Sequence, residues 1–239
     1  MKTLVKLIIF SASLFQIVFA QSQSPIVQEQ NIQEIGQNWY NGSVITFDKR
    51  YKGVKGSPFL TEEWLPGTIT LNNDTIIEDL HLKYNVQENR LYRRAENEKA
   101  NLILNYLVKS FSIVGSGSMR NFIRVSLKDE KGEEINQFVE LFAQGKLNLI
   151  SKPECRIRKA DSNNVYGSGR QYDEFIQNSS LYIYPKGERI AKQVKESKKF
   201  FIELMPDKEN EIKAYFKENK PFLKDQQVVS KLVQYCNQL

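Results

Sequence analysis

The middle of the chain alternates apolar and polar residues with a period of two. Apolar side chains stand at Leu80, Leu82, Tyr84 and Val86, and between them lie Asp79, His81, Lys83 and Asn85. Because successive side chains of a β-strand point to opposite faces, this pattern predicts a strand with one face on a core and the other in water. The period recurs at Ile123, Val125 and Leu127 and again at Val139, Leu141 and Ala143. One-sided alternation is typical of antiparallel sheets.

Short polar or glycine-bearing stretches separate the alternating runs. They occupy residues 72–74, 87–90, 115–118, 129–134 and 145–146. Such stretches predict turns between antiparallel neighbours, because parallel strands need much longer crossovers. The polar stretch 161–173 predicts a longer mobile loop before a last strand at 181–184.

After residue 197 the spacing of apolar residues becomes helical. Ser197 and Asp225 can cap helices, and Pro206 can end one helix and start the next. The apolar positions are Phe200, Phe201 and Leu204, then Ile212, Tyr215 and Phe216, then Val229, Leu232, Val233 and Cys236. We therefore predict an α+β fold, in which an antiparallel β-meander forms a curved sheet or partial barrel and is followed by C-terminal helices at 197–239. Residues 44–239 are expected to form this single β-rich domain.

The N-terminus has the pattern of a cleaved export signal. Lys2 and Lys6 precede an apolar run over 7–19, and Val18 and Ala20 stand at the two positions that a signal peptidase reads. This predicts a signal peptide over 1–20 and a polar lead over 21–43; an uncleaved amphipathic helix is the alternative. The chain contains no later run long enough to span a bilayer. We therefore expect a soluble protein that is periplasmic or extracellular.

The charge of the chain argues against a nucleic-acid partner. The formal net charge is +6, and removal of residues 1–20 takes away two lysines and no acidic residue, which leaves +4. Basic residues are interspersed with acidic ones, and no arginine cluster alternates with stacking aromatics.

The stretch YKGVKGSPFLTEEWLPGTITL at 51–71 is dense in glycine and proline. A phosphate-binding loop would need a helix directly after its glycines, with a lysine and a hydroxyl residue at the junction. Here Pro66 and Gly67 predict a turn, and strand-like residues follow. We interpret the stretch as the corner of a sheet, with Trp64 either closing one end of the core or stacking on a ligand.

The same region resembles a family of exported proteins from gram-negative bacteria whose function is uncharacterised. The resemblance rests on the run from Gly56 to Leu60 (GSPFL), then Gly67, then Tyr84 followed by asparagine. It extends more loosely to the tail around Cys236, where relatives often carry an aromatic residue. It implies an exported β-sheet protein and assigns no catalytic residue.

Residues with catalytic or metal-binding chemistry are sparse. His81 is the single histidine and falls on the predicted water face, so neither a histidine-built zinc site nor a histidine-assisted serine triad is expected. We predict no catalytic, cofactor-binding or metal-binding residue. A hydrolase that uses dispersed carboxylates, such as Asp79, Glu140 and Glu174, remains as a third hypothesis.

Two functions of different classes are compatible with the pattern. One is a non-enzymatic binding or carrier module of the cell envelope, which would hold a small apolar ligand in the concavity of the sheet. Its candidate ligand-facing residues are Trp64, Tyr84, Tyr106 and Phe111, with Leu141 and Leu147 on the same predicted face. The other is a structural or protein-interaction component with a filled concavity, whose working surface is a sheet edge or the loop 161–173.

Cys155 and Cys236 are the two cysteines of the chain. Export to an oxidising compartment favours a disulfide between them, whereas the place of Cys236 on the apolar stripe of the last helix favours buried free thiols. A bridge would close a loop of about 80 residues, worth about 4–5 kcal/mol by the chain-entropy estimate. The sequence leaves both alternatives open.

Overall fold

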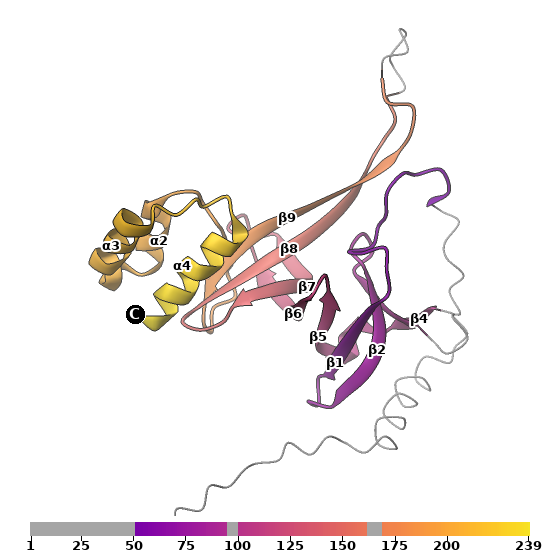
Figure 1. The fold of residues 1–239 in the computed structure, drawn as a ribbon, viewed down its shortest axis with the longest axis horizontal. Helices are drawn as coiled ribbons and strands as arrows, with labels where there is room; N and C mark the ends of the chain where they lie inside the picture. Colours follow the sequence, from indigo (N-terminus) through magenta and orange to yellow (C-terminus); the bar gives the residue numbers. More distant parts are fainter. Residues whose placement is uncertain (1–50, 95–99, 162–168) are drawn as a thin grey trace, which may run out of the picture.

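The computed structural model describes residues 51–94, 100–161 and 169–239 (Figure 1). The predicted signal peptide, the polar lead, the predicted start of the sheet near residue 44 and the middle of the predicted loop 161–173 lie outside the described residues. The described chain forms an open antiparallel sheet followed by C-terminal helices, which confirms the α+β class.

The sheet has ten strands in the order β10-β9-β8-β7-β6-β5-β1-β2-β3-β4. They are β1 (Leu65–Leu71), β2 (Ile76–Asn85), β3 (Arg90–Arg94), β4 (Ala100–Ile103), β5 (Val108–Gly115), β6 (Ser118–Lys128), β7 (Glu134–Ala143), β8 (Leu147–Arg158), β9 (Glu174–Pro185) and β10 (Lys192–Gln193). The predicted meander is interrupted once, because β5 pairs with β1 and not with β4. A short 3-10 turn, η2 (Asn105–Leu107), makes this return to the centre of the sheet.

Pro66 and Gly67 lie inside β1, so the turn predicted at this dipeptide is wrong. A Cβ at Gly67 would stand 2.3 Å from the Ser112 carbonyl oxygen of β5. The glycine therefore allows β1 and β5 to approach closely. This explains why a turn-like dipeptide occupies a strand.

Strand β2 contains a bulge. Gly67 of β1 pairs with Leu80, whereas Ile69 pairs with Ile77, so β2 has one residue more than β1 between these pairs. Asp79 has a φ of 56°, in the left-handed region. The bulge places Ile77 and Leu80 in the same core, although they are three positions apart and simple alternation would set them on opposite faces.

The first core is aromatic at its centre and lies between β1–β4 and β5–β7. Four rings meet there, those of Tyr84, Phe111, Phe122 and Phe138, with ring centroids 4.7 to 6.2 Å apart. Their side chains are at most 2% exposed. We call these four residues the aromatic core. The concavity of this half of the sheet is thus filled by side chains.

Asn89 attaches the β2–β3 turn to β7. Its Oδ1 accepts hydrogen bonds from the Tyr84 hydroxyl at 2.9 Å and from the Phe138 N–H at 3.4 Å, and its Nδ2 donates to the Asn136 carbonyl at 3.3 Å. These β7 residues precede Glu140, where the pairing with β8 begins. Asn89 therefore satisfies backbone groups at a part of β7 that β8 does not cover.

Residues 147–151 of β8 and 182–183 of β9 are buried on both faces of the sheet. Leu149 and Ile183 point to one face and Ile150 and Tyr182 to the other, as successive strand residues must. The first pair joins the helix core, and the second joins a rear core on the opposite face. The helix core also includes Ala143, Leu147, Phe200, Phe201, Ile212, Val229, Leu232, Val233 and Cys236, and the rear core includes Val125, Leu127, Ile135, Val139 and Ala191.

Three helices cover the helix-core face of β8 and β9 (Figure 1). They are α2 (Lys198–Leu204), α3 (Glu209–Asn219) after the short η3 (Pro206–Lys208), and α4 (Gln226–Gln238). Both predicted caps are confirmed: the Ser197 hydroxyl accepts from the N–H of Phe200, and the Asp225 carboxylate accepts from two N–H groups of α4. No helix in the described part of the chain is long and apolar enough to cross a membrane.

Asn237 fastens α4 to the sheet. Its Oδ1 accepts from the Leu147 N–H at 2.7 Å, and its Nδ2 donates to the Leu147 carbonyl at 2.9 Å. A Cβ at Gly145 would lie 2.6 Å from the Asn237 Cγ. Gly145 therefore leaves room for the Asn237 side chain. This side chain bonds to both the N–H and the carbonyl of Leu147, as the backbone of a neighbouring strand would.

Candidate functional site

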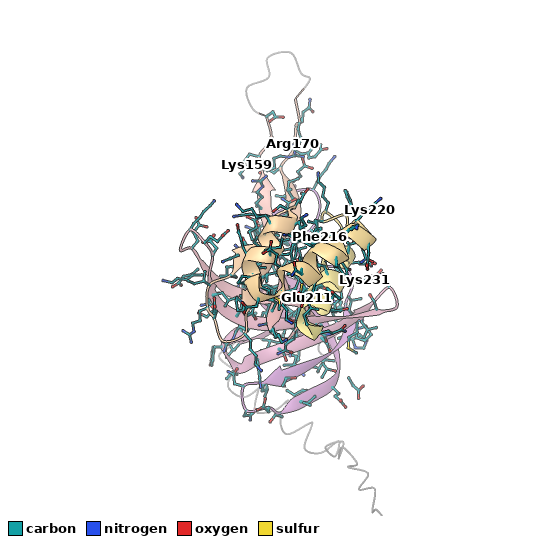
Figure 2. All side chains as sticks on the ribbon, turned by 90° about the vertical axis from the view of Figure 1, so that its left-hand side faces the viewer. Lys159, Arg170, Glu211, Phe216, Lys220 and Lys231 are labelled. Atoms are coloured by element: carbon teal, nitrogen blue, oxygen red, sulfur yellow. The ribbon has the colours of Figure 1, made fainter. Side chains whose placement is uncertain are left out.

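The most prominent surface feature is a long two-stranded arm. Strand β8 pairs with β7 only as far as Ser151, but its pairing with β9 continues to Arg158. The ribbon therefore stands out from the rest of the sheet (Figure 1). We call residues 152–161 and 169–180 the arm. Its outer part carries Lys159 and Arg170, beyond the helices in the view of Figure 2.

Ion pairs stabilise the outer part of the arm. Arg158 and Arg170 both bind the Glu174 carboxylate, and the Lys159 ammonium lies 2.9 Å from the Asp173 carboxylate. The hydrogen bond from Arg158 is the main cause of a lowered pKa of Glu174, and the hydrogen bond from Lys159 is the main cause of a lowered pKa of Asp173. Opposite charges thus alternate across the ribbon, as in a solvated hairpin.

Residues 51–60, which we call the crossing segment, brace the outer part of the arm on its β9 side. The Lys55 N–H donates to the Asp173 carbonyl and the Phe175 N–H donates to the Lys55 carbonyl, both at 2.9 Å. At its other end, the Leu60 N–H donates to the Tyr84 carbonyl at 2.8 Å. The segment therefore joins the outer edge of β9 to the first core. The chain continues from Gly53 and Gly56 into β1 and not into a helix, so it does not form the strand–glycine–helix arrangement of a phosphate loop.

The β8 side of the arm borders a hollow of about 430 Å³. Its walls come from β8 and β9 of the arm, from Val86 and Gln87 in the β2–β3 turn, and from Gln137 of β7. Cys155 and Arg156 line it from β8. We call this hollow the edge groove. It lies where β7 and β8 diverge.

A second hollow, of about 480 Å³, lies on the helix side of the arm base. It is lined by the Arg120–Glu140 pair, by hydroxyl and amide side chains of the arm, and by Gln226 at the start of α4. Arg120 binds Glu140 with two hydrogen bonds, of 2.8 and 2.7 Å. The pair uses both Glu140 oxygens, so the charge of this carboxylate is neutralised by a neighbour.

The four predicted ligand-facing residues do not form one surface. Tyr84 and Phe111 belong to the filled aromatic core, where burial also raises the pKa of Tyr84. Trp64 is half-buried near Lys83, whose ammonium lies 5.8 Å from its ring centroid. Tyr106 is 60% exposed in η2.

Leu141 and Leu147 were predicted to share the inward face, but the structure separates them. Leu141 packs against the rear core and Leu147 lies in the helix core.

The three carboxylates of the hydrolase hypothesis do not converge. Glu140 pairs with Ser151 and Glu174 pairs with Arg158, so their positions lie seven residue steps apart along β8. At about 3.3 Å per residue this is about 23 Å, beyond the roughly 9.5 Å that paired glycosidase carboxylates span. Asp79 lies in the β2 bulge, on another part of the sheet.

The two cysteines are not brought together. Both thiols are free: Cys236 is buried in the helix core, whereas Cys155 packs against the first core and lines the edge groove. Burial raises the pKa of both thiols, that of Cys236 to about 11. Of the two alternatives left open by the sequence, the structure has free thiols, one buried and one half-buried, and no disulfide between Cys155 and Cys236.

His81 is exposed on β2, as predicted. Among the described residues, no group of three or more histidine, cysteine, aspartate or glutamate side chains is placed to hold a metal ion.

The unpaired β8 edge of the arm was not predicted from the sequence pattern. Pro153 could have indicated this edge, because proline inside a strand is largely confined to edge strands and bulges. No known protein family, curated protein or solved structure matches the chain.

Proposed function

We propose that this chain is an exported, non-enzymatic interaction module of the cell envelope that contacts a protein partner through its arm. One observation carries the proposal: β8 leaves β7 after Ser151 and continues with β9 as a projecting ribbon. A two-stranded ribbon is marginally stable alone, and here the crossing segment braces its outer part through β9. Binding surfaces are commonly placed on such projections from a rigid scaffold.

The carrier hypothesis has less support. It requires an open apolar concavity, whereas the aromatic core fills the concavity of the first half of the sheet. Both hollows at the base of the arm are lined largely by polar side chains. Such a lining does not suit a small apolar ligand.

Site-specific photo-crosslinking in the producing cells tests the proposal. A photoreactive residue replaces Lys159 on the arm in one variant and Lys199 on α2 in the control variant; these side chains are 78% and 85% exposed. We expect a discrete adduct with one protein from position 159 and none from position 199. If position 159 gives no adduct, or gives the same adducts as position 199, the arm is not an interaction surface.

A further inference from the structure

The pairing of the arm shows which backbone groups of β8 point away from β9. The Phe175 N–H donates outward from β9 to Lys55, and Phe175 pairs with Ile157. In an antiparallel ladder, two paired residues direct their backbone groups either toward each other or both away. The N–H and C=O of Ile157 therefore point to the other edge of β8, and so do those of Cys155, two residues earlier.

The remaining contacts of β8 agree with this assignment. The Pro153 carbonyl, on the same edge, accepts a hydrogen bond from the Gln137 side chain at 2.8 Å. Ser151, again two residues earlier, faces β7 and pairs with Glu140. Beyond Pro153, no strand of the described chain pairs with this edge of β8. Four backbone groups, those of Cys155 and Ile157, thus lie along an unpaired edge.

The two edges of the arm differ in this respect. The crossing segment bonds to β9 at Asp173 and Phe175, so the β9 edge is occupied there. The β8 edge instead faces the edge groove, which Arg156 also lines. Arg156 is exposed and has no ion-pair partner among the described residues, in contrast to Arg158 and Arg170. The groove therefore offers unpaired backbone donors and acceptors beside an unneutralised cation.

We infer that an extended segment of the partner protein adds to the β8 edge of the arm as a further strand, bonds to the backbone of Cys155 and Ile157, and places an acidic side chain near Arg156. This inference rests on the proposed function and names how the partner binds. In strand addition the backbone bonds supply affinity, and nearby side chains supply specificity. An acidic residue would complement the charge of Arg156. The nearby carboxylate of Glu154 would not repel it strongly, because Glu154 is paired with Lys152 at 3.0 Å.

In the register centred on Cys155, a second copy of this chain fits the edge less well than a foreign strand. Antiparallel self-pairing centred on Cys155 would set Ile157 opposite the second copy's Pro153. That proline has no N–H, and its carbonyl already accepts from Gln137. Self-pairing would thus lose bonds on both sides of its centre, whereas a partner strand without proline there would lose none.

Selected peptides provide the test. Ten-residue peptides are selected on the full chain from a random display library, and each selected peptide is compared with a version in which its acidic residues are replaced by lysine. Binding is measured by fluorescence anisotropy against wild type, Ile157→Pro, the matched control Ile157→Ala and Arg156→Gln. Hydrogen exchange of the wild-type amides is measured with and without the peptide.

Ile157→Pro removes the outward N–H and leaves the inward ladder bonds, so we expect affinity to fall about tenfold, as loss of one good hydrogen bond implies. Ile157→Ala keeps the N–H and should stay within about threefold, because only side-chain contacts change. Arg156→Gln should weaken the acidic peptide and not its lysine version. In wild type, the Cys155 and Ile157 amides should exchange more slowly when the peptide is bound, a result that does not depend on how the variants fold.

Several outcomes would overturn the inference. Peptides that bind without protecting these two amides, or that bind Ile157→Pro as tightly as Ile157→Ala, would exclude strand addition. Sedimentation showing a dimer that Ile157→Pro dissociates would assign the edge to a second copy instead. If the adduct from position 159 persists in Ile157→Pro, the arm is an interaction surface but the partner does not use the β8 edge; if no adduct forms at all, the proposed function fails as well.

Discussion

The hydrogen bonds of Asn89 predict a measurable coupling to Tyr84. Asn89→Gly removes the acceptor of the buried Tyr84 hydroxyl and two long bonds to the β7 backbone, and keeps the left-handed backbone, whose φ is 49°. An unpaired buried hydroxyl costs about 1–3 kcal/mol, and each long bond contributes about 0.5 kcal/mol. We therefore expect Asn89→Gly to lower the free energy of unfolding by about 2–4 kcal/mol. Asn89→Ala should cost about 1 kcal/mol more, because a Cβ is strained in this backbone region.

Tyr84→Phe separates the hydroxyl from the other contacts. Alone it removes the donor and should cost about 1 kcal/mol. In the double variant Tyr84→Phe/Asn89→Gly no hydroxyl is left unpaired, so the loss should be smaller than the sum of the single losses by about 1 kcal/mol or more. Urea unfolding followed by fluorescence measures wild type, all three single variants and the double variant, with m-values compared to confirm that the unfolded states are alike. Additivity within about 0.5 kcal/mol would refute the coupling and the role given to Asn89.

Four further outcomes are expected. Asn237→Ala should lower the free energy of unfolding by about 2–3 kcal/mol in urea titrations, since two backbone groups of β8 lose their partners. His81→Ala should stay within about 0.5 kcal/mol of wild type, because the side chain is exposed; a larger loss would contradict the register of β2. Thiol titration of the unreduced, denatured protein should find both Cys155 and Cys236 reactive, and two unreactive groups would show a bridge. In a carboxyl NMR titration, the midpoint of Glu174 should lie below the ordinary pKa of glutamate. The ion pairs of Glu174 therefore stabilise the fold fully above the ordinary pKa, and this stabilisation is lost as the pH falls through the lowered pKa. An ordinary midpoint would contradict the pairing with Arg158.

The candidate site was only partly predictable. A sheet edge was predicted as one working surface, but the sequence does not determine which edge, because edges depend on strand order. The strand order here depends on the pairing of β5 with β1, and no local sequence pattern near residue 104 predicts that pairing. The free edge of β8 follows from where β7 stops pairing, at Glu140 and Ser151.

Local patterns were sufficient where one element faces one core. The stripe of α4 and its Asp225 cap could be identified from spacing alone, since helical periodicity and capping depend on neighbours within a few residues. The alternation from Leu80 to Val86 likewise predicted the buried face of β2. These features of the chain were set by the sequence without reference to distant segments.

Tertiary structure decided everything that depends on residues far apart in the chain. The bulge at Asp79 turns Ile77 and Leu80 toward the same core, against simple alternation. Asn85, predicted to face water, is buried where the crossing segment pairs with it at Phe59. Leu147 and its neighbours in β8 are buried on both faces because the helix core covers one face of the strand and the rear core covers the other. A side chain's environment is the sum of contacts with distant segments, so the periodicity of one strand fixes its faces but not what covers them.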